Sequence, residues 1–304
     1  MSHFGKIASC VVLGLSVGLS HGALAADMPL KAPPPPAPAV FNWSGGYVGL
    51  NAGYGWSSGS ANIVNGDPAS ELFVTNIPFS GTFASSFHQN GGLAGAQAGY
   101  NWQIAPNWIV GLETDIQYAH ITGSSTHTIF LDPAVFGANF PFIVNSQRAL
   151  LDWFGTVRGR VGVLVNPNMM VYGTGGLAYG EDRASGAITL APPSGVATTA
   201  SATSGAFSFS CSAVGPATTT CYAGSNSRTS LGYAAGAGLE YHLWGNLTAK
   251  LEYLHVGFSG QTVNLISPPP SSAGVFLGYG FNREAFDLVR AGLNYKFPVG
   301  SRGN

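Results

Sequence analysis

The sequence predicts an all-β protein, an eight-stranded antiparallel up-and-down transmembrane β-barrel with long extracellular loops and short periplasmic turns. Charged residues make up only 8% of the chain, against roughly 25% in soluble domains. No run of 18 apolar residues is present, and a transmembrane helix would need one. Segments of about ten residues instead alternate between apolar and polar side chains. Near the C-terminus, Val289, Leu293 and Phe297 alternate with Arg290 and Lys296, as expected for a wall between lipid and water.

Eight segments share this period of two, which is the signal of a strand with two different faces. They span residues 47–56, 94–102, 108–118, 151–165, 169–179, 231–243, 247–256 and 288–297. Short connections rich in Pro, Asn and Gly predict tight turns, at residues 104–107, 166–168 and 244–246. The other connections are long and predict extracellular loops, at residues 57–92, 121–150, 180–230 and 257–285. This asymmetry between the two ends is typical of outer-membrane barrels.

The chain begins with features of an export signal over residues 1–25. Lys6 precedes a short apolar run, and Ala23-Leu24-Ala25 is a small-residue cleavage site. Residues 26–42 follow as a Pro-rich periplasmic leader, with six prolines between positions 29 and 38. The barrel is predicted over residues 43–297, and residues 298–304 form a C-terminal tail.

Charged residues concentrate on the polar faces of the predicted strands. Eight strands leave an interior only wide enough for side chains, where isolated charges would be costly to desolvate. The sequence therefore predicts a lumen filled by paired charges. A narrow ion-conducting path lined by the same residues is the alternative. The predicted lumen charges are Glu113, Asp115, Asp152, Arg158, Arg160, Glu240, Lys250, Glu252, Arg290 and Lys296.

Two cysteines remain after the signal, Cys211 and Cys221, in a Ser/Thr-rich stretch with no histidine nearby. A cysteine pair in an exported protein favours a disulfide over a zinc site.

His88 and His127 fall in predicted external loops and could ligate haem iron or zinc. None of the histidines shows metal-ligand spacing, so no metal, cofactor or catalytic group is predicted. The formal net charge of −1 argues against a nucleic-acid partner, which would require a basic patch.

Several ordered motifs resemble a known family. They are Trp43-Ser44-Gly45-Gly46-Tyr47-Val48-Gly49, Gly99-Tyr100-Asn101-Trp102-Gln103, Trp153-Phe154-Gly155-Thr156-Val157-Arg158-Gly159-Arg160, Leu251-Glu252-Tyr253-Leu254 and the final strand 288–297. Together they resemble the eight-stranded opacity-type outer-membrane proteins of alphaproteobacteria, also called outer-membrane immunogenic or porin-family barrels.

The resemblance implies an abundant surface barrel without known catalysis, whose relatives act as surface antigens, adhesins or haem binders. It also implies insertion by the barrel assembly machinery, which reads an aromatic C-terminal strand; here Tyr295 and Phe297 provide that signal. The chain departs from the pattern after Phe297, where Pro298 ends the strand and a tail follows.

The leading functional hypothesis is a structural, surface-exposed barrel that anchors four extracellular loops and catalyses no reaction. A small non-specific porin is the second hypothesis, and a surface receptor or adhesin for haem or a host surface is the third. The expected location is the outer membrane of a Gram-negative bacterium, with both termini periplasmic. The expected partners are outer-membrane lipids and lipopolysaccharide, the barrel assembly machinery, and an extracellular ligand of the loops.

Overall fold

The computed structural model describes residues 41–65, 79–80, 84–131, 141–192, 194–204, 207–266, 276–282 and 284–297. The chain divides into two units, Met1–Ala39 and Val40–Asn304, and the description below concerns the second. The predicted signal 1–25, the leader 26–42 except its last two residues, and the tail 298–304 lie outside the described residues. Among the described residues, no helix is long and apolar enough to cross a membrane.

Strands account for nearly all of the described residues. They are β1 (Gly45–Asn65), β2 (Phe79–Ser80), β3 (Ala84–Ala105), β4 (Trp108–Ala119), β5 (Ile121–Leu131), β6 (Pro141–Asn166), β7 (Met169–Leu190), β8 (Ala197–Ser204), β9 (Phe207–Val214), β10 (Thr219–Trp244), β11 (Leu247–Phe258), β12 (Gln261–Ile266), β13 (Phe276–Phe281) and β14 (Glu284–Lys296).

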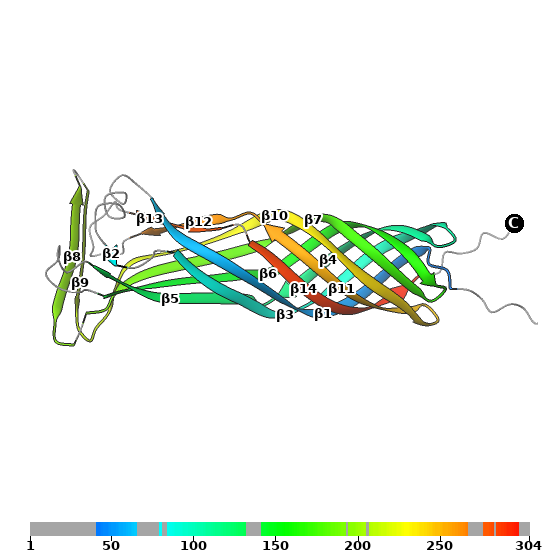
Figure 1. Cartoon of the computed structure of the whole chain (residues 1–304), viewed down its shortest axis with the longest axis horizontal. Coiled ribbons are helices and arrows are strands. Elements are labelled where there is room, and N and C mark those ends of the chain that lie inside the picture. The colour runs from blue at the N-terminus through cyan, green and yellow to red at the C-terminus, as the bar shows by residue number, and fades with distance from the viewer. Residues whose placement is uncertain are drawn as a thin grey trace, which may run out of the picture. The chain divides into compact units, whose positions relative to one another are not determined.

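The sheet closes on itself as a barrel. Antiparallel pairing runs in the order β1–β3–β4–β6–β7–β10–β11–β14 and returns from β14 to β1. This first ring passes through eight strands, as the sequence predicts, and its strands can be followed in Figure 1. Closure matters because an open sheet edge would leave backbone groups unpaired in lipid, at several kcal/mol each.

Three tight turns lie at one end of the barrel, which we call the turn end. They are formed around residues 106–107, 167–168 and 245–246, within the predicted connections. Gly245 has a φ of 55°, a left-handed conformation that glycine adopts without steric cost. The backbone of Phe297 bonds to Gly46 and that of Lys296 to Asn246, so both ends of the described barrel chain lie here.

The prediction of long loops is wrong over much of their length, because many of these residues form strands. At the opposite end, which we call the distal end, the sheet closes again as a second ring. Its strands follow the order β1–β13–β12–β10–β7–β6–β5–β3. The strands β5, β12 and β13 take the places of β4, β11 and β14 (Figure 1). Apolar and polar residues alternate only weakly in these stretches. The strands predicted from the sequence therefore end before the observed strands do.

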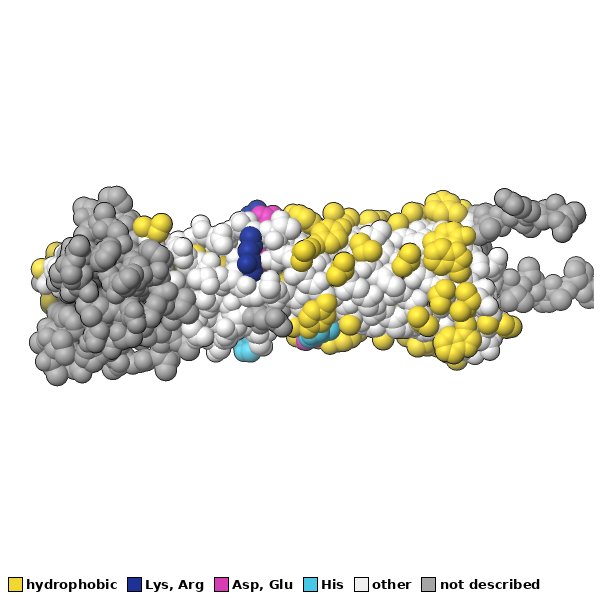
Figure 2. Space-filling model, turned by 90° about the horizontal axis from the view of Figure 1, so that it is seen from above, with side chains coloured by type: hydrophobic (Ala, Val, Ile, Leu, Met, Phe, Trp, Pro, Cys, Tyr) yellow, Lys and Arg dark blue, Asp and Glu magenta, His cyan; other side chains and the backbone are white. Residues whose placement is uncertain are grey.

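The outer surfaces of the two rings differ in polarity. Large apolar side chains are exposed around the first ring and gather in two bands, whereas most of the second ring's surface is polar (Figure 2). Exposed aromatic residues at the ends of this apolar zone include Tyr54, Trp56, Tyr118, Tyr233 and Tyr253 on the distal side. On the turn side they include Tyr100, Trp102, Trp108, Tyr241, Trp244, Tyr295 and Phe297. Aromatic girdles of this kind mark the two membrane interfaces.

An apolar layer fills the barrel interior near the distal girdle. It comprises Leu93, Ala119, Ile121, Phe154, Ala178, Ala234, Leu254, Val256, Phe258, Phe286 and Leu288, each at most 5% exposed. The rings of Phe258 and Phe286 pack against each other, with centroids 6.5 Å apart. A smaller cluster of Trp43, Ile109, Met170 and Tyr172 closes the turn end.

Replacing Phe286 by alanine should reduce the free energy of unfolding by about 3 kcal/mol, because the change leaves a cavity in the apolar layer. Phe286→Leu keeps most of the apolar volume and should cost less than about 1.5 kcal/mol. Urea unfolding of the protein in lipid vesicles measures both values. Equal stability of the alanine variant and the wild type would show that the layer is not tightly packed.

Candidate functional site

The candidate site is a buried charge network inside the first ring. It contains four carboxylates and four cations, and every one of these residues is at most 3% exposed. The members are Glu113 and Asp115 from β4, Arg158 and Arg160 from β6, Glu240 from β10, Lys250 and Glu252 from β11, and Arg290 from β14. Each side chain points inward because its neighbours in the strand point to lipid, as the period of two requires.

Two arginines occupy the centre of the charge network. Arg158 donates hydrogen bonds to Glu113 at 2.5 Å, to Asp115 at 2.9 Å and to Glu252 at 3.1 Å. Arg290 contacts Asp115 at 2.8 Å and Glu252 at 2.6 Å. The planar guanidinium group suits such multiple contacts with carboxylates. The contacts join β4, β6, β11 and β14 across the lumen.

The remaining cations extend the network toward the turn end. Lys250 donates to both carboxylate oxygens of Glu113, at 2.9 and 3.0 Å. Arg160 bonds to Glu240 at 2.8 Å and to the Tyr47 hydroxyl at 2.9 Å, and its guanidinium lies 4.0 Å from the centroid of the Tyr172 ring. A cation over an aromatic face is stabilised further when both are desolvated.

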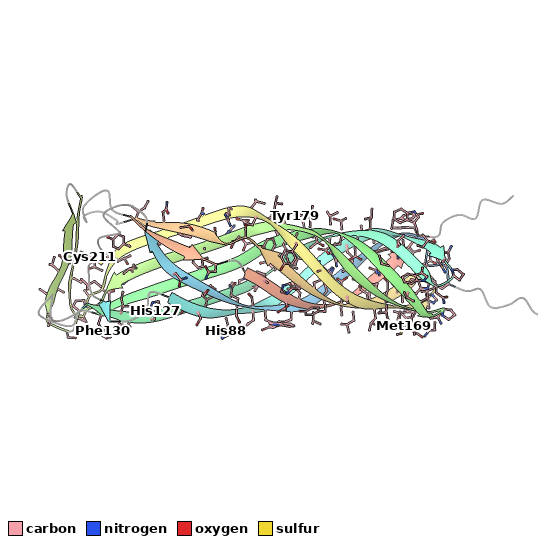
Figure 3. The ribbon with its side chains drawn as sticks, turned by 45° about the horizontal axis from the view of Figure 1, so that its top comes forward. His88, His127, Phe130, Met169, Tyr179 and Cys211 are labelled. Atoms are coloured by element: carbon pink, nitrogen blue, oxygen red, sulfur yellow. A yellow bond between two sulfur atoms is a disulfide. The ribbon has the colours of Figure 1, made fainter. Side chains whose placement is uncertain are left out.

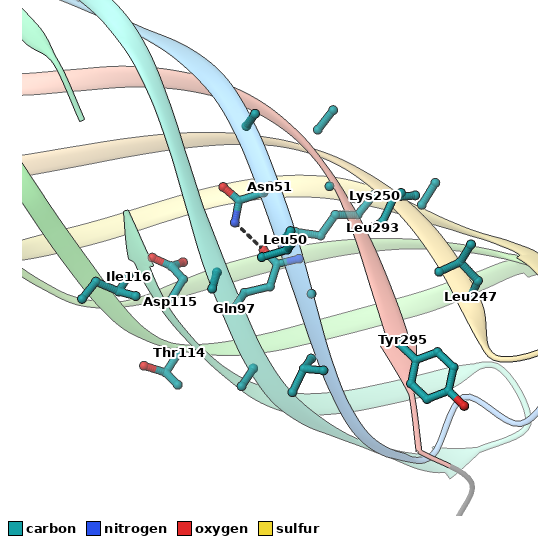
Figure 4. A pocket seen from close by; sticks show the side chains of 18 of the residues that line it. Leu50, Asn51, Gln97, Thr114, Asp115, Ile116, Leu247, Lys250, Leu293 and Tyr295 are labelled. Carbon is teal, nitrogen blue, oxygen red and sulfur yellow. Dashed lines mark hydrogen bonds between the residues drawn. The ribbon is translucent and has the colours of Figure 1, made fainter. Parts of the chain in front are cut away.

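Neutral polar side chains complete the bonding of the carboxylates. Glu240 accepts hydrogen bonds from Thr248 at 2.6 Å and from Asn294 at 3.0 Å. Asn294 accepts a bond from Gln97, which in turn accepts one from Asn51 at 2.8 Å. Figure 4 shows the bonded pair Asn51 and Gln97 beside Asp115 and Lys250. These amides were not among the predicted site residues, although their inward parity beside charged neighbours could have identified them.

Lys296 is buried but lies apart from the eight-member network, at the turn end. Its ammonium donates to the backbone carbonyl of Trp43 and lies 5.3 and 5.5 Å from the ring centroids of Phe41 and Trp43. The Trp43 indole donates to the Pro167 carbonyl at 3.1 Å. Residues just before β1 therefore cover the lumen at this end.

The prediction that Asp152 is a lumen charge is wrong, because its side chain does not face the lumen. Its side chain is 47% exposed and pairs at 2.9 Å with Arg183, which is itself 51% exposed. The pairing of β6 with β7 shifts register between Leu150 and Phe154, so the alternation that holds from Phe154 onward fails at Asp152. Arg183 also bonds to Glu181, and hydrogen bonds from Ser227 and Arg183 lower the pKa of the Glu181 carboxyl.

The histidines proposed for haem or zinc lie on separate strands of the distal half. His88, in β3, is exposed and lies 3.1 Å from the Ser58 hydroxyl. His127, in β5, is partly buried. Figure 3 shows the two at different positions along the barrel. Within the described ranges, no group of three or more His, Cys, Asp or Glu residues could hold a metal ion.

The predicted disulfide is present between Cys211 and Cys221, with Cα atoms 5.5 Å apart. It joins β9 to the start of β10 at the distal end (Figure 3). Tyr295 and Phe297 lie at the turn end, half-exposed, with ring centroids 5.7 Å apart. This position places the predicted assembly signal on the outer surface of the last strand.

Comparison with known proteins decides the family. A family model described as an outer membrane protein beta-barrel domain matches residues 30–297. The chain belongs to this family. The 31 kDa outer-membrane immunogenic protein of Brucella melitensis is 31% identical over 298 residues, which cover 95% of this chain and 99% of the relative. This protein is thus an outer-membrane β-barrel protein.

One further relative and one solved structure are similar to this chain at lower sequence identity. The 25 kDa outer-membrane immunogenic protein of Brucella canis is 24% identical and is covered over 96% of its length, with 94% of this chain. Among solved structures, the outer membrane protein OprG from Pseudomonas aeruginosa aligns with a TM-score of 0.40 and 9% identity, over 84% of this chain and 97% of that one. The names of the two Brucella relatives describe outer-membrane immunogenic proteins.

Replacing Arg158 by methionine should reduce the free energy of unfolding by about 3–5 kcal/mol, because three buried carboxylates lose a shared partner. The matched control is Arg183→Met, which breaks an exposed, solvent-screened ion pair and should destabilise the protein far less. Urea titration of both variants in vesicles tests the difference. Similar small losses for the two variants would contradict the description of the charge network as a desolvated unit.

Proposed function

We propose that this protein is a structural outer-membrane barrel whose lumen is closed and whose working surface is its distal end. The observation that supports this most strongly is the pair of stacked layers inside the barrel. The charge network occupies the middle of the first ring, and the apolar layer occupies its distal part. Conduction would require ions to pass both a self-neutralised network and a dry apolar constriction, and constrictions of the second kind prevent the passage of ions.

We further propose that the turn end faces the periplasm and the distal end faces the outside. Short periplasmic turns and long external segments are the usual asymmetry of such barrels. The relatives named as immunogenic outer-membrane proteins fit a protein with an exposed distal end. In this orientation the exposed aromatic bands contact outer-membrane lipids and lipopolysaccharide, and Tyr295 and Phe297 present the final strand to the barrel assembly machinery.

Current recording in a planar bilayer distinguishes the proposed closed barrel from a porin. Protein refolded from residue 26 onward should show no discrete current steps, while a general porin in the same bilayer provides the positive control. Phe258→Ala combined with Phe286→Ala should remain silent as well, because the charge network still fills the lumen. Reproducible steps from correctly folded wild-type protein, with an ion selectivity altered by Lys250→Gln, would replace this proposal with a pore.

The orientation can be tested with single cysteines, since Cys211 and Cys221 are bonded to each other. Thr199→Cys places a thiol on the exposed part of the distal hairpin, and Asn107→Cys places one in an exposed turn. A membrane-impermeant maleimide should label the first variant in intact cells. It should label the second only after the outer membrane has been permeabilised. The opposite pattern would reverse the proposed orientation.

A further inference from the structure

The hairpin at the distal end forms a sheet of its own. β8 and β9 pair in antiparallel register from Ala197–Val214 to Ser204–Phe207, separately from the barrel sheet. Among the described residues, β8 pairs with β9 alone. One long side of β8 therefore carries backbone N–H and C=O groups without a strand partner, and such an edge is a template for another strand.

The hairpin is joined to β10 through β9, because the disulfide links Cys211 of β9 to Cys221 of β10. Backbone hydrogen bonds of Gly195 and Val196 with Gly215 continue the pairing of the two hairpin arms toward their base. Cys211 and Ala213 are buried on one face of the hairpin, whereas Ala197, Thr199, Ser212 and Val214 are exposed on the other face. The disulfide thus attaches the hairpin to β10 through β9, and, within the described residues, β8 is the strand with the unpaired edge.

The features that normally prevent edge-to-edge pairing are absent from this hairpin. Natural proteins protect free edges with charged residues, especially lysine, or with proline. The sequence from residue 184 to residue 227 contains no Lys, Arg, Asp or Glu, and residues 197–214 contain no proline.

We propose that the free edge of β8 is a self-association site, at which β8 of a second copy of this chain adds as an antiparallel strand. A contact between identical copies is isologous, so any charge near its axis would face its own equivalent. A segment without charges avoids this repulsion and offers the same backbone pattern to its copy. The product is a four-stranded sheet, β9–β8–β8–β9, that joins two barrels at their distal ends.

In a cell this contact would link copies on facing membranes, which rests on the proposed outward orientation of the distal end. The association itself does not depend on that orientation. It can be measured with the full mature chain at one copy per lipid nanodisc, where both ends of the barrel are accessible. The measurement is also independent of whether the lumen conducts.

The decisive experiment is a charge exchange on β8. Wild-type protein in nanodiscs should form dimers of discs in a concentration-dependent manner by sedimentation. When β8 pairs with its copy around a two-fold axis at Ala200, near the middle of the strand, Thr199 of one copy lies opposite Ser201 of the other. Thr199→Lys with Ser201→Lys, or Thr199→Asp with Ser201→Asp, should weaken dimerisation at least about tenfold, because like charges then face each other across strands roughly 5 Å apart. An equimolar mixture of the Lys and Asp variants should regain dimers, now of mixed composition.

The control variant carries the same charges on the barrel wall, as Ala223→Lys with Ser225→Lys, two exposed positions of β10. It should dimerise like the wild type. An intact disulfide, shown by resistance to alkylation, establishes that each hairpin is formed. Wild-type discs that remain monomeric would overturn the proposal, and so would a Lys–Asp mixture that associates no better than either variant alone.

Discussion

The ion pairs of the lumen are the constraint on which the rest of the structure depends. Within the first ring, four carboxylates and four cations come from β4, β6, β10, β11 and β14. They bond directly to Tyr47 of β1 and Tyr172 of β7, and Asn294 connects Glu240 to Gln97 of β3 and Asn51 of β1. A shift of any charged strand by one residue would turn its charges to lipid. That exposure would cost about 2–4 kcal/mol for each Arg or Lys at the bilayer midplane, so the network and the lipid together select a single register.

The sequence reveals the first ring because its two faces meet different solvents. In β11, Leu251 and Tyr253 face lipid while Lys250 and Glu252 face the lumen, and this contrast is visible residue by residue. The same reasoning placed Asp152 wrongly in the lumen, because a register shift interrupts the alternation there. A bulge is set by the pairing with the neighbouring strand, which a pattern along one strand cannot show.

The apolar layer was missed for a different physical reason, because the hydrophobic face of several strands changes sides near the distal girdle. Along β11 the inward residues change from Lys250 and Glu252 to Leu254 and Val256, while the outward residue becomes His255. β14 shows the same exchange, with Phe286 and Leu288 inside and Asp287 outside. The exchange marks the level at which lipid is replaced by water, and it is readable in the sequence once it is sought.

Beyond that level the barrel follows the rules of a water-soluble protein, with apolar residues inside and polar residues outside. Ala61, Phe87, Val263 and Phe281 are buried within the second ring, and Ser58 and His88 are exposed on its surface. A polar outer face has little contrast with a Ser- and Gly-rich loop, which is why these strands resemble loops in the sequence. The consequence is that the sheet continues through β5, β12 and β13 where the sequence predicted loops, and this continued sheet carries the β8–β9 hairpin, which is bonded to β10 through Cys211 and Cys221. Under the proposed self-association, a strand that is ordered before binding would lose less entropy when its partner adds, so the filled lumen would supply stability while the hairpin supplies the contact.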